Sequence, residues 1–214
     1  SSDVIDIARA RRRAEDTLRW IVTNLDGLKI PELPTNKRVQ LAGGCWHVAL
    51  EHAGAVVVLV DDRIYGSALA MLRPLAESYI RGLWLAHAAS DEEVDDAGDD
   101  DFPKDFGKLL RDIDNVFEGI GLVDFKKQHW KRLCSYTHTG YAQIGARLTP
   151  EGLGDRYSKA DIIDSVRWAE LIAMQCLAQF AQLAGSHLLA HAVLDRMRAH
   201  VEADKAAREV GRQG

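Results

Sequence analysis

Apolar residues recur three or four positions apart along almost the whole chain, which is the spacing of one face of an α-helix. An acidic stretch at 90–101 and a glycine-rich stretch at 149–157 are predicted to be surface connections. Helices are predicted over residues 4–25, 36–62, 67–89, 103–120, 124–137, 141–148 and 159–208. The pattern therefore predicts an all-α, single-domain helical bundle over residues 1–214 with a long C-terminal helix.

The predicted helix at 67–89 is apolar on all sides, so it belongs at the centre of the bundle. Ser67 is predicted to cap this helix, and Pro74 either kinks it or marks its true start. The last helix is expected to bend at Gly185. Its charged end, residues 191–214, is predicted to project from the bundle or to pair with another copy.

The composition is that of an ordinary globular protein, with 47% hydrophobic and 28% charged residues among 214. A domain of this size buries about 70% of the surface that its unfolded chain exposes, so it needs neither a disulfide nor a metal for stability. The net charge of −5 argues against a protein that coats nucleic acid non-specifically. It leaves room for a local basic cleft.

The three cysteines, Cys45, Cys134 and Cys176, lie far apart, which predicts reduced thiols in a cytoplasmic protein. The N-terminal residues are charged and lack the apolar core of a signal peptide. The longest apolar run, from Ala53 to Val60, is far short of the roughly 20 residues that cross a membrane. We therefore expect no membrane association, and nothing in the chain indicates a cofactor.

The segment from Arg132 to Tyr141 reads R-L-C-S-Y-T-H-T-G-Y. It resembles the R-x(4–6)-H motif of the HEPN superfamily, in which a glycine and a tyrosine often follow the histidine. The resemblance implies a small α-helical bundle, commonly dimeric, and many members are metal-independent ribonucleases of toxin–antitoxin or phage-defence systems. Residues 72–84 are also similar to bacterial proteins of unknown function that carry such a motif. The residue after the arginine is usually polar in active members and is Leu133 here, which weighs against activity more than against ancestry.

The resemblance implies Arg132 and His138 as catalytic residues, supported by Ser135 and Tyr141 of the same motif. It also implies a homodimer, an RNA substrate and a cognate antitoxin. Histidine changes charge near neutral pH and transfers protons there, and arginine offers a planar fork to phosphate oxygens. Six residues on a helix place the two side chains about 120° apart, so either the arginine reaches round or two copies pool their motifs. The competing interpretation is an arginine and a histidine stabilised beside the carbonyls of a helix end.

Arg73, Glu77 and Arg81 are spaced four residues apart on the most apolar helix, where they form one polar stripe. Buried charges are costly unless they are paired. The stripe therefore predicts either a salt-bridge ladder or a set of supporting residues that faces His138 and adds positive charge to a phosphate-binding cleft.

His187 and His191 are one helical turn apart, and His47 lies on the predicted second helix. If the fold brought them together, they could bind a divalent metal, an arrangement similar to the DinB-like metal-dependent hydrolases. A further alternative is a non-catalytic helical module that mediates interactions or senses nucleotides.

Overall fold

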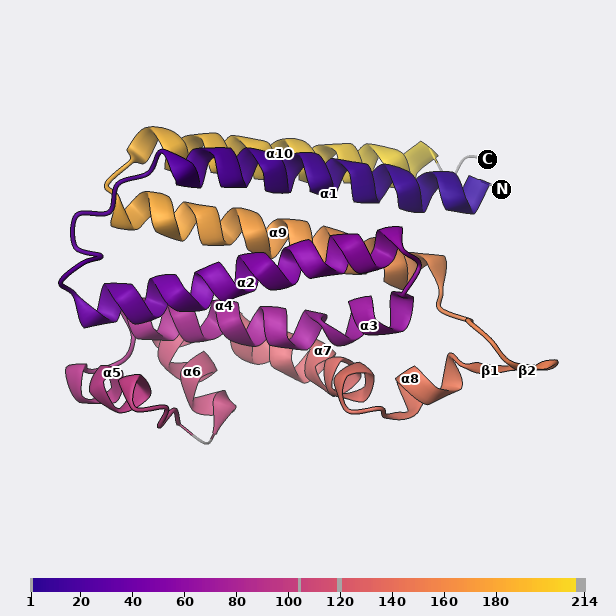
Figure 1. The fold of residues 1–214 in the computed structure, drawn as a ribbon, viewed down its shortest axis with the longest axis horizontal. Coiled ribbons are helices and arrows are strands. Elements are labelled where there is room, and N and C mark those ends of the chain that lie inside the picture. Colours follow the sequence, from indigo (N-terminus) through magenta and orange to yellow (C-terminus); the bar gives the residue numbers. More distant parts are fainter. Residues whose placement is uncertain (1, 104, 119–120, 211–214) are drawn as a thin grey trace.

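The computed structural model describes residues 2–103, 105–118 and 121–210, and this part of the chain is a helical bundle (Figure 1). The helices are α1 (Ser2–Asp26), α2 (Lys37–Asp61), α3 (Tyr65–Ala70), α4 (Leu72–His87), α5 (Asp91–Gly98), α6 (Phe106–Val116), α7 (Leu122–Thr137), α8 (Tyr141–Gly145), α9 (Lys159–Leu183) and α10 (His187–Val210). Between α8 and α9, β1 (Leu148–Thr149) pairs antiparallel with β2 (Gly152–Leu153), and Leu148 lies opposite Leu153. The predicted all-α single-domain bundle is confirmed.

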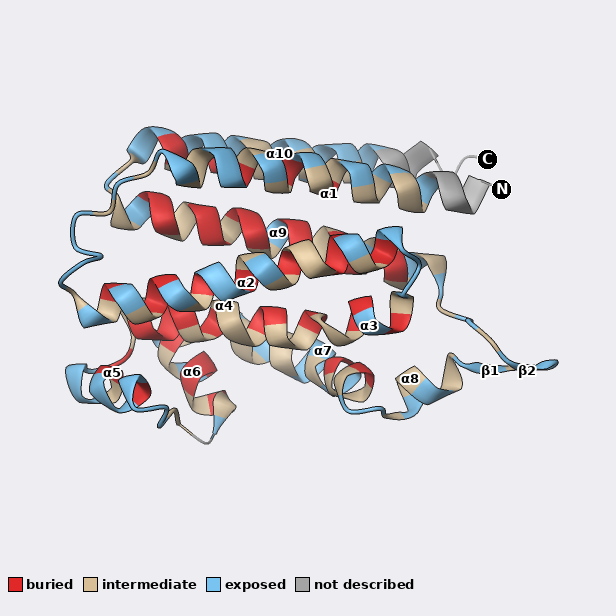
Figure 2. Ribbon diagram, in the orientation of Figure 1, coloured by how far each residue is buried: buried red, intermediate tan, exposed pale blue. Residues whose placement is uncertain are grey.

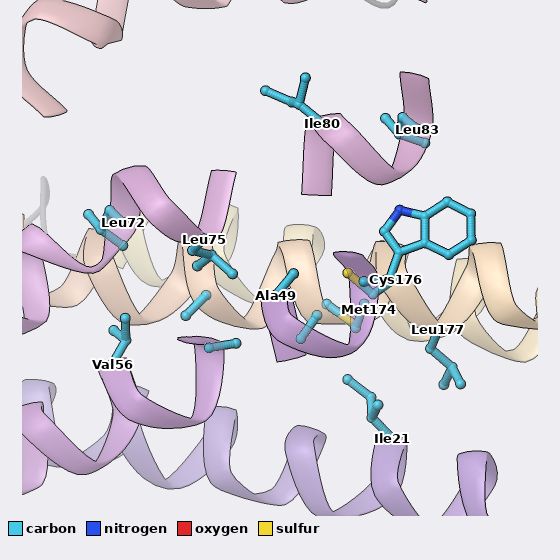
Figure 3. Close-up of a cluster of buried hydrophobic side chains, with 14 of the residues drawn as sticks. Ile21, Ala49, Val56, Leu72, Leu75, Ile80, Leu83, Met174, Cys176 and Leu177 are labelled. Atoms are coloured by element: carbon cyan, nitrogen blue, oxygen red, sulfur yellow. The ribbon is translucent and has the colours of Figure 1, made fainter. Parts of the chain in front are cut away.

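The core lies where α2, α4 and α9 meet, and buried residues concentrate on these helices (Figure 2). α1 and α10 pack on α9 from one side, while α6 and α7 pack on α4 from the other (Figure 1). Ile21 of α1, Ala49 of α2, Leu75 of α4 and Leu177 of α9 all lie in this core (Figure 3). The helical spacing of apolar residues thus accounts for which face each helix buries.

α2 and α4 approach closely because α4 has a glycine opposite the largest side chain of α2. Trp46 is fully buried, and a β-carbon at Gly82 would collide with its indole nitrogen. The Trp46 ring also meets Phe180 of α9 edge-on, with ring centroids 5.7 Å apart. This contact fixes which faces of the three central helices meet.

The predicted helix at 67–89 is divided at Met71 into α3 and α4. Ser67 lies inside α3, which begins at Tyr65 without a side-chain cap, so the predicted cap at Ser67 is wrong. Pro74 lies in the first turn of α4, where backbone N–H groups have no partner within the helix. The alternative in which Pro74 marks the start of the buried helix is therefore confirmed.

The acidic stretch at 90–101 is more than a connection, because residues 91–98 form α5. The Ser90 hydroxyl accepts a hydrogen bond from the Glu93 backbone, and the Glu93 carboxylate accepts one from the Ser90 backbone. Val94 and Ala97 are buried. The remaining acidic residues face solvent, so the stretch forms a short amphipathic helix.

The predicted helix at 159–208 is two helices, not one bent helix. Gly185 has a φ of +66°, and the Ser186 N–H donates to the Ala181 carbonyl at 2.8 Å while the Gly185 N–H donates to the Gln182 carbonyl at 3.0 Å. This Schellman motif ends α9 and reverses the chain. α10 packs back along α9, buries Leu189 and Val193, and forms ion pairs with Arg13 and Arg167 through Asp204. The part of the predicted tail at 211–214 lies outside the described residues.

A polar network attaches α10 to α1 and α9. Glu170 of α9 is only 1% exposed and accepts hydrogen bonds from Arg13 Nε at 3.0 Å, Arg13 Nη2 at 2.6 Å and the Thr17 hydroxyl at 2.8 Å. His200 of α10 places Nδ1 3.2 Å from the same carboxylate, and Asp204 accepts from Arg13 Nη1 at 2.8 Å. These three helices are therefore joined by charged groups as well as by apolar contacts.

By length and composition, α2 is the one helix in the described part of the chain that could cross a membrane, although its longest uninterrupted apolar run is short. In the bundle it packs against α4 and α9, with Ala49, Ala53 and Val56 fully buried. The core helix of a bundle meets the same criteria of length and hydropathy.

Candidate functional site

The motif from Arg132 to His138 occupies the C-terminal end of α7. Leu133 and Tyr136 are buried against the bundle, which leaves Arg132 and His138 exposed on either side of them. Leu133, which departs from the polar residue of active HEPN proteins, therefore occupies a core position. α7 is also held at its other end, where the Asp114 carboxylate accepts hydrogen bonds from the Leu122 and Val123 backbone, both at 2.9 Å.

The residues that follow His138 form the turn into α8. Thr139 has a φ of +55°, and the Gly140 N–H donates to the Ser135 carbonyl at 2.7 Å. A β-carbon at Gly140 would lie 2.9 Å from the Ser135 α-carbon, so only glycine fits there. The Ser135 hydroxyl accepts a hydrogen bond from the Ala142 backbone at 2.9 Å. Ser135 and Gly140 thus shape the turn, and Tyr141 is 82% exposed just beyond it.

Arg132 points toward α9. Its Nη2 donates to both carboxylate oxygens of Asp161 at 2.6 Å, and its guanidinium lies 5.8 Å from the ring centroid of Tyr136. The hydrogen bond with Tyr136 and the charge of Asp161 raise the pKa of Arg132 above its ordinary value. Arg132 is therefore a cation that already has a carboxylate partner.

His138 points toward α4, where its Nε2 contacts Nη1 of Arg73. The Arg73 Nε donates to Glu77 at 2.8 Å, and the Arg73 guanidinium lies 5.4 Å from the ring centroid of Trp130. Trp130 is in turn stacked on Phe106, with ring centroids 4.7 Å apart. An exposed imidazole and a braced guanidinium are thus in direct contact at the surface.

Arg81, the third member of the predicted stripe, lies elsewhere. Its guanidinium is 4.6 Å from the ring centroid of Phe102, and its Nε is buried without a hydrogen-bond partner among the described residues. The stripe is therefore neither one continuous ladder nor a single cluster at His138. Arg73 and Glu77 join His138, and Arg81 packs on an aromatic ring one turn further along α4.

Two surface cavities flank Arg132. One of about 190 Å³ is also lined by His129, Tyr136, Asp161 and Asp164, among other residues. A second of about 400 Å³ is lined by residues that include Tyr141, Arg156, Tyr157 and Asp161, and burial raises the pKa of Tyr157. Neither cavity is lined by His138.

The structure therefore groups Arg132 with His129, which the sequence analysis did not single out. His129 precedes Arg132 by three residues and Tyr136 follows it by four, so all three share one face of α7. That spacing could have identified His129. Asp161 could not be found in this way, because it belongs to a helix 29 residues further along the chain.

The alternative metal ligands do not come together. The described part of the chain contains no group of three or more histidine, cysteine, aspartate or glutamate side chains that could hold a metal ion. His47 is exposed on α2, and His191 uses its Nδ1 to bond the backbone carbonyl of His187 at 2.7 Å. The predicted site of His47, His187 and His191 is thus not assembled.

These features define a class: an all-α bundle in which an exposed histidine at the end of α7 contacts a partly buried arginine of α4. A family model matches residues 46–203, and the chain belongs to that family, described as a family of unknown function (DUF6988). The match begins in α2 and ends in α10, so it includes every residue of the candidate site described above. No curated protein and no solved structure matches the chain.

Proposed function

We propose that the protein is a HEPN-like, metal-independent endoribonuclease that acts as a cytoplasmic homodimer in a toxin or phage-defence role. The observation that carries the proposal is the contact between His138 Nε2 and Arg73 Nη1, with Arg73 braced by Glu77. A histidine beside a fixed guanidinium combines a proton-transfer group with a group that binds phosphate oxygens. The motif resemblance and the helical bundle support the same proposal.

The chemistry needs no metal. His138 takes the proton from a ribose 2′-hydroxyl as the 2′-oxygen forms a bond to the adjacent phosphorus. The bond from phosphorus to the 5′-oxygen breaks, and a protonated histidine gives its proton to that leaving oxygen. The products are a 2′,3′-cyclic phosphate and a 5′-hydroxyl, while Arg73 stabilises the charge that develops on the phosphate.

The dimer has a specific role in this proposal. His138 faces α4 and Arg132 faces α9, so the two motif side chains of one copy have different partners. A second copy that places its motif opposite the first supplies both the second histidine and an additional arginine. A cognate antitoxin would act by covering this surface.

The test is cleavage of a labelled single-stranded RNA by the purified protein in excess EDTA. His138→Ala is expected to slow cleavage by about 10²-fold or more, the contribution of a general acid or base, and Arg73→Ala is expected to slow it as well. His187→Ala removes an exposed histidine at the start of α10 and is the matched control. RNA with 2′-O-methyl groups should remain intact, because it lacks the nucleophile.

Two further readouts complete the experiment. Thermal unfolding of each variant separates a lost catalytic group from a lost fold. Induced expression of wild type should arrest growth with loss of RNA integrity, and both His138→Ala and Arg132→Ala should relieve the arrest. Intact RNA in both settings, with folded wild-type protein, would overturn the proposal.

A second candidate function is a non-catalytic interaction or nucleotide-sensing module, and the Arg132–Asp161 ion pair favours it. A guanidinium that already shares both oxygens of a carboxylate is less available to a reacting phosphate than a free one. This candidate predicts nucleotide or RNA binding without strand cleavage, whereas the ribonuclease predicts both.

A further inference from the structure

A cavity of about 320 Å³ lies between α6 and α7, and Trp130, whose ring also contacts Arg73, is one of the residues that line it. Leu110, Val123 and Trp130 give it an apolar floor, and Arg111, Lys126 and Lys127 give it cationic walls. Its volume is at the lower end of the range for small-molecule sites, which suits a single nucleotide better than a larger ligand.

The positive groups of this cavity outnumber the carboxylates beside them. Arg111 Nη1 and Lys126 Nζ both lie 3.1 Å from the position that a β-carbon would take at Gly107, and Asp105 Oδ1 lies 2.9 Å from it. Arg111 is paired with Asp105 at 2.8 Å, and the charge of Lys126 also lowers the pKa of Asp105. Asp105 thus compensates one of the two charges, and the pair retains one positive charge that a bound phosphate can neutralise.

Further cations continue along α7 toward the candidate site. Lys127, Lys131 and His138 are exposed and lie on one side of the helix, at positions four and then seven residues apart. Lys127 pairs with Asp124 at 3.1 Å, whereas Lys131 makes no ion pair in the part of the chain that the structure describes. This local basic strip contrasts with the net charge of −5.

Trp130 connects the cavity to the candidate site. Its ring lines the cavity, stacks on Phe106 and lies beneath the guanidinium of Arg73, which contacts His138. With Phe106 against it and Arg73 above it, the ring serves as a fixed wall for a ligand rather than as an open stacking surface. A ligand in the cavity is thus held in a defined position relative to His138.

We propose that this α6–α7 cavity binds one nucleotide of a single-stranded RNA whose backbone runs along α7 to His138. The base packs on Leu110, Val123 and the edge of Trp130, and the phosphates are bound by Arg111, Lys126 and Lys131. The inference rests on the proposed function for the identity of the ligand as RNA. It adds a subsite that selects an unpaired nucleotide at a fixed distance from the cleaved bond.

The experiment measures binding without cleavage, by fluorescence anisotropy of a labelled single-stranded 2′-O-methyl RNA in EDTA. Lys126→Ala removes one of the cations that line the cavity and is expected to weaken binding and to reduce the slope of log K against log salt by roughly 0.7, the value for one contact to a single strand. Val123→Phe fills the cavity without altering charge and is expected to weaken binding about tenfold, within the range measured for one base contact. Arg198→Ala, an exposed cation on α10, is the control that should change neither quantity.

The outcomes separate this inference from the ribonuclease proposal. Loss of binding in Lys126→Ala and Val123→Phe supports the subsite even if wild type cleaves no RNA, in which case only the proposed function fails. Unchanged binding in both variants, or no binding by wild type, overturns the subsite even if RNA is cleaved. Equal affinity for duplex RNA would also contradict it, because a paired base cannot enter the cavity.

Discussion

The side chain of Glu170 carries a carboxylate into the bundle at 1% exposure, where Arg13, Thr17 and His200 surround it. Glu170→Gln is expected to lower the free energy of unfolding by about 3 kcal/mol, because removing one partner of a buried ion pair leaves the other poorly compensated. Urea denaturation followed by circular dichroism measures the change.

Glu202→Gln, which neutralises an exposed carboxylate on α10, is the matched control and should leave the urea midpoint nearly unchanged. A similar small effect for both variants would mean that Asp204 alone compensates Arg13. The Glu170 network would then contribute nothing to stability.

The candidate site shows which contacts of individual residues the sequence could predict and which it could not. Six residues on a helix predict that Arg132 and His138 diverge, and they contact α9 and α4 respectively. The contact of His138 with Arg73 joins residues 65 positions apart, and the polar stripe made it one of two expected arrangements that spacing alone could not decide between. The partner of Arg132, Asp161, had no signal of its own, since an aspartate in the first turn of a helix is common.

At the scale of elements, the turn between α9 and α10 depends on one glycine. Gly185→Ala is expected to cost about 1 kcal/mol of unfolding free energy, since a φ of +66° strains any residue with a β-carbon. Gly44→Ala is the counterpart, because this exposed glycine inside α2 has no neighbouring atom within 4 Å of where a β-carbon would lie, and the substitution should stabilise by up to about 1 kcal/mol. Opposite shifts in the urea midpoint are expected, and shifts of the same sign would contradict the assigned turn.

Most helical segments were predictable because apolar spacing and prolines mark them, but several boundaries were not, among them the starts of α3 and α5. The hydroxyl of Ser67 suggested a cap, yet α3 begins two residues earlier, where Tyr65 is packed against the core. At Ser90 the serine and Glu93 carry the signature of a capping box, but the density of acidic residues around it indicated a solvated connection. Tertiary packing decided the boundary at Tyr65, whereas at Ser90 the local capping box did.

At the scale of the whole molecule, acidification is expected to destabilise the bundle through His200. Burial lowers the pKa of His200 below 6.5, with Arg13 and Arg196 acting in the same direction and Glu170 and Asp204 opposing them. The folded protein then binds fewer protons here than the unfolded chain, so this stability is complete above the unfolded pKa and is lost as the pH falls below it. The free energy of unfolding should therefore decrease between about pH 7.5 and about pH 5.5.

Urea titrations at the two pH values, with His200→Gln and with His191→Gln as the exposed control, measure this dependence. His200→Gln should flatten it and His191→Gln should not. The carboxylates of Glu93 and Asp105 also have lowered pKa values, from hydrogen bonds with Lys108 and Arg111 respectively, but their contribution is lost only at lower pH. An unaltered slope in His200→Gln would assign the dependence to other groups.

The way α10 is attached has a consequence for the motions of the native state. Leu189 and Val193 are its buried apolar side chains among the described residues, and much of its remaining contact with α1 and α9 is charged. Detaching α10 exposes little apolar surface compared with opening the core of α2, α4 and α9. Amide hydrogens of α10 should therefore exchange with solvent through a local opening that leaves the rest of the bundle folded. Those of α2, α4 and α9 should be more strongly protected against exchange, although all four helices belong to one domain.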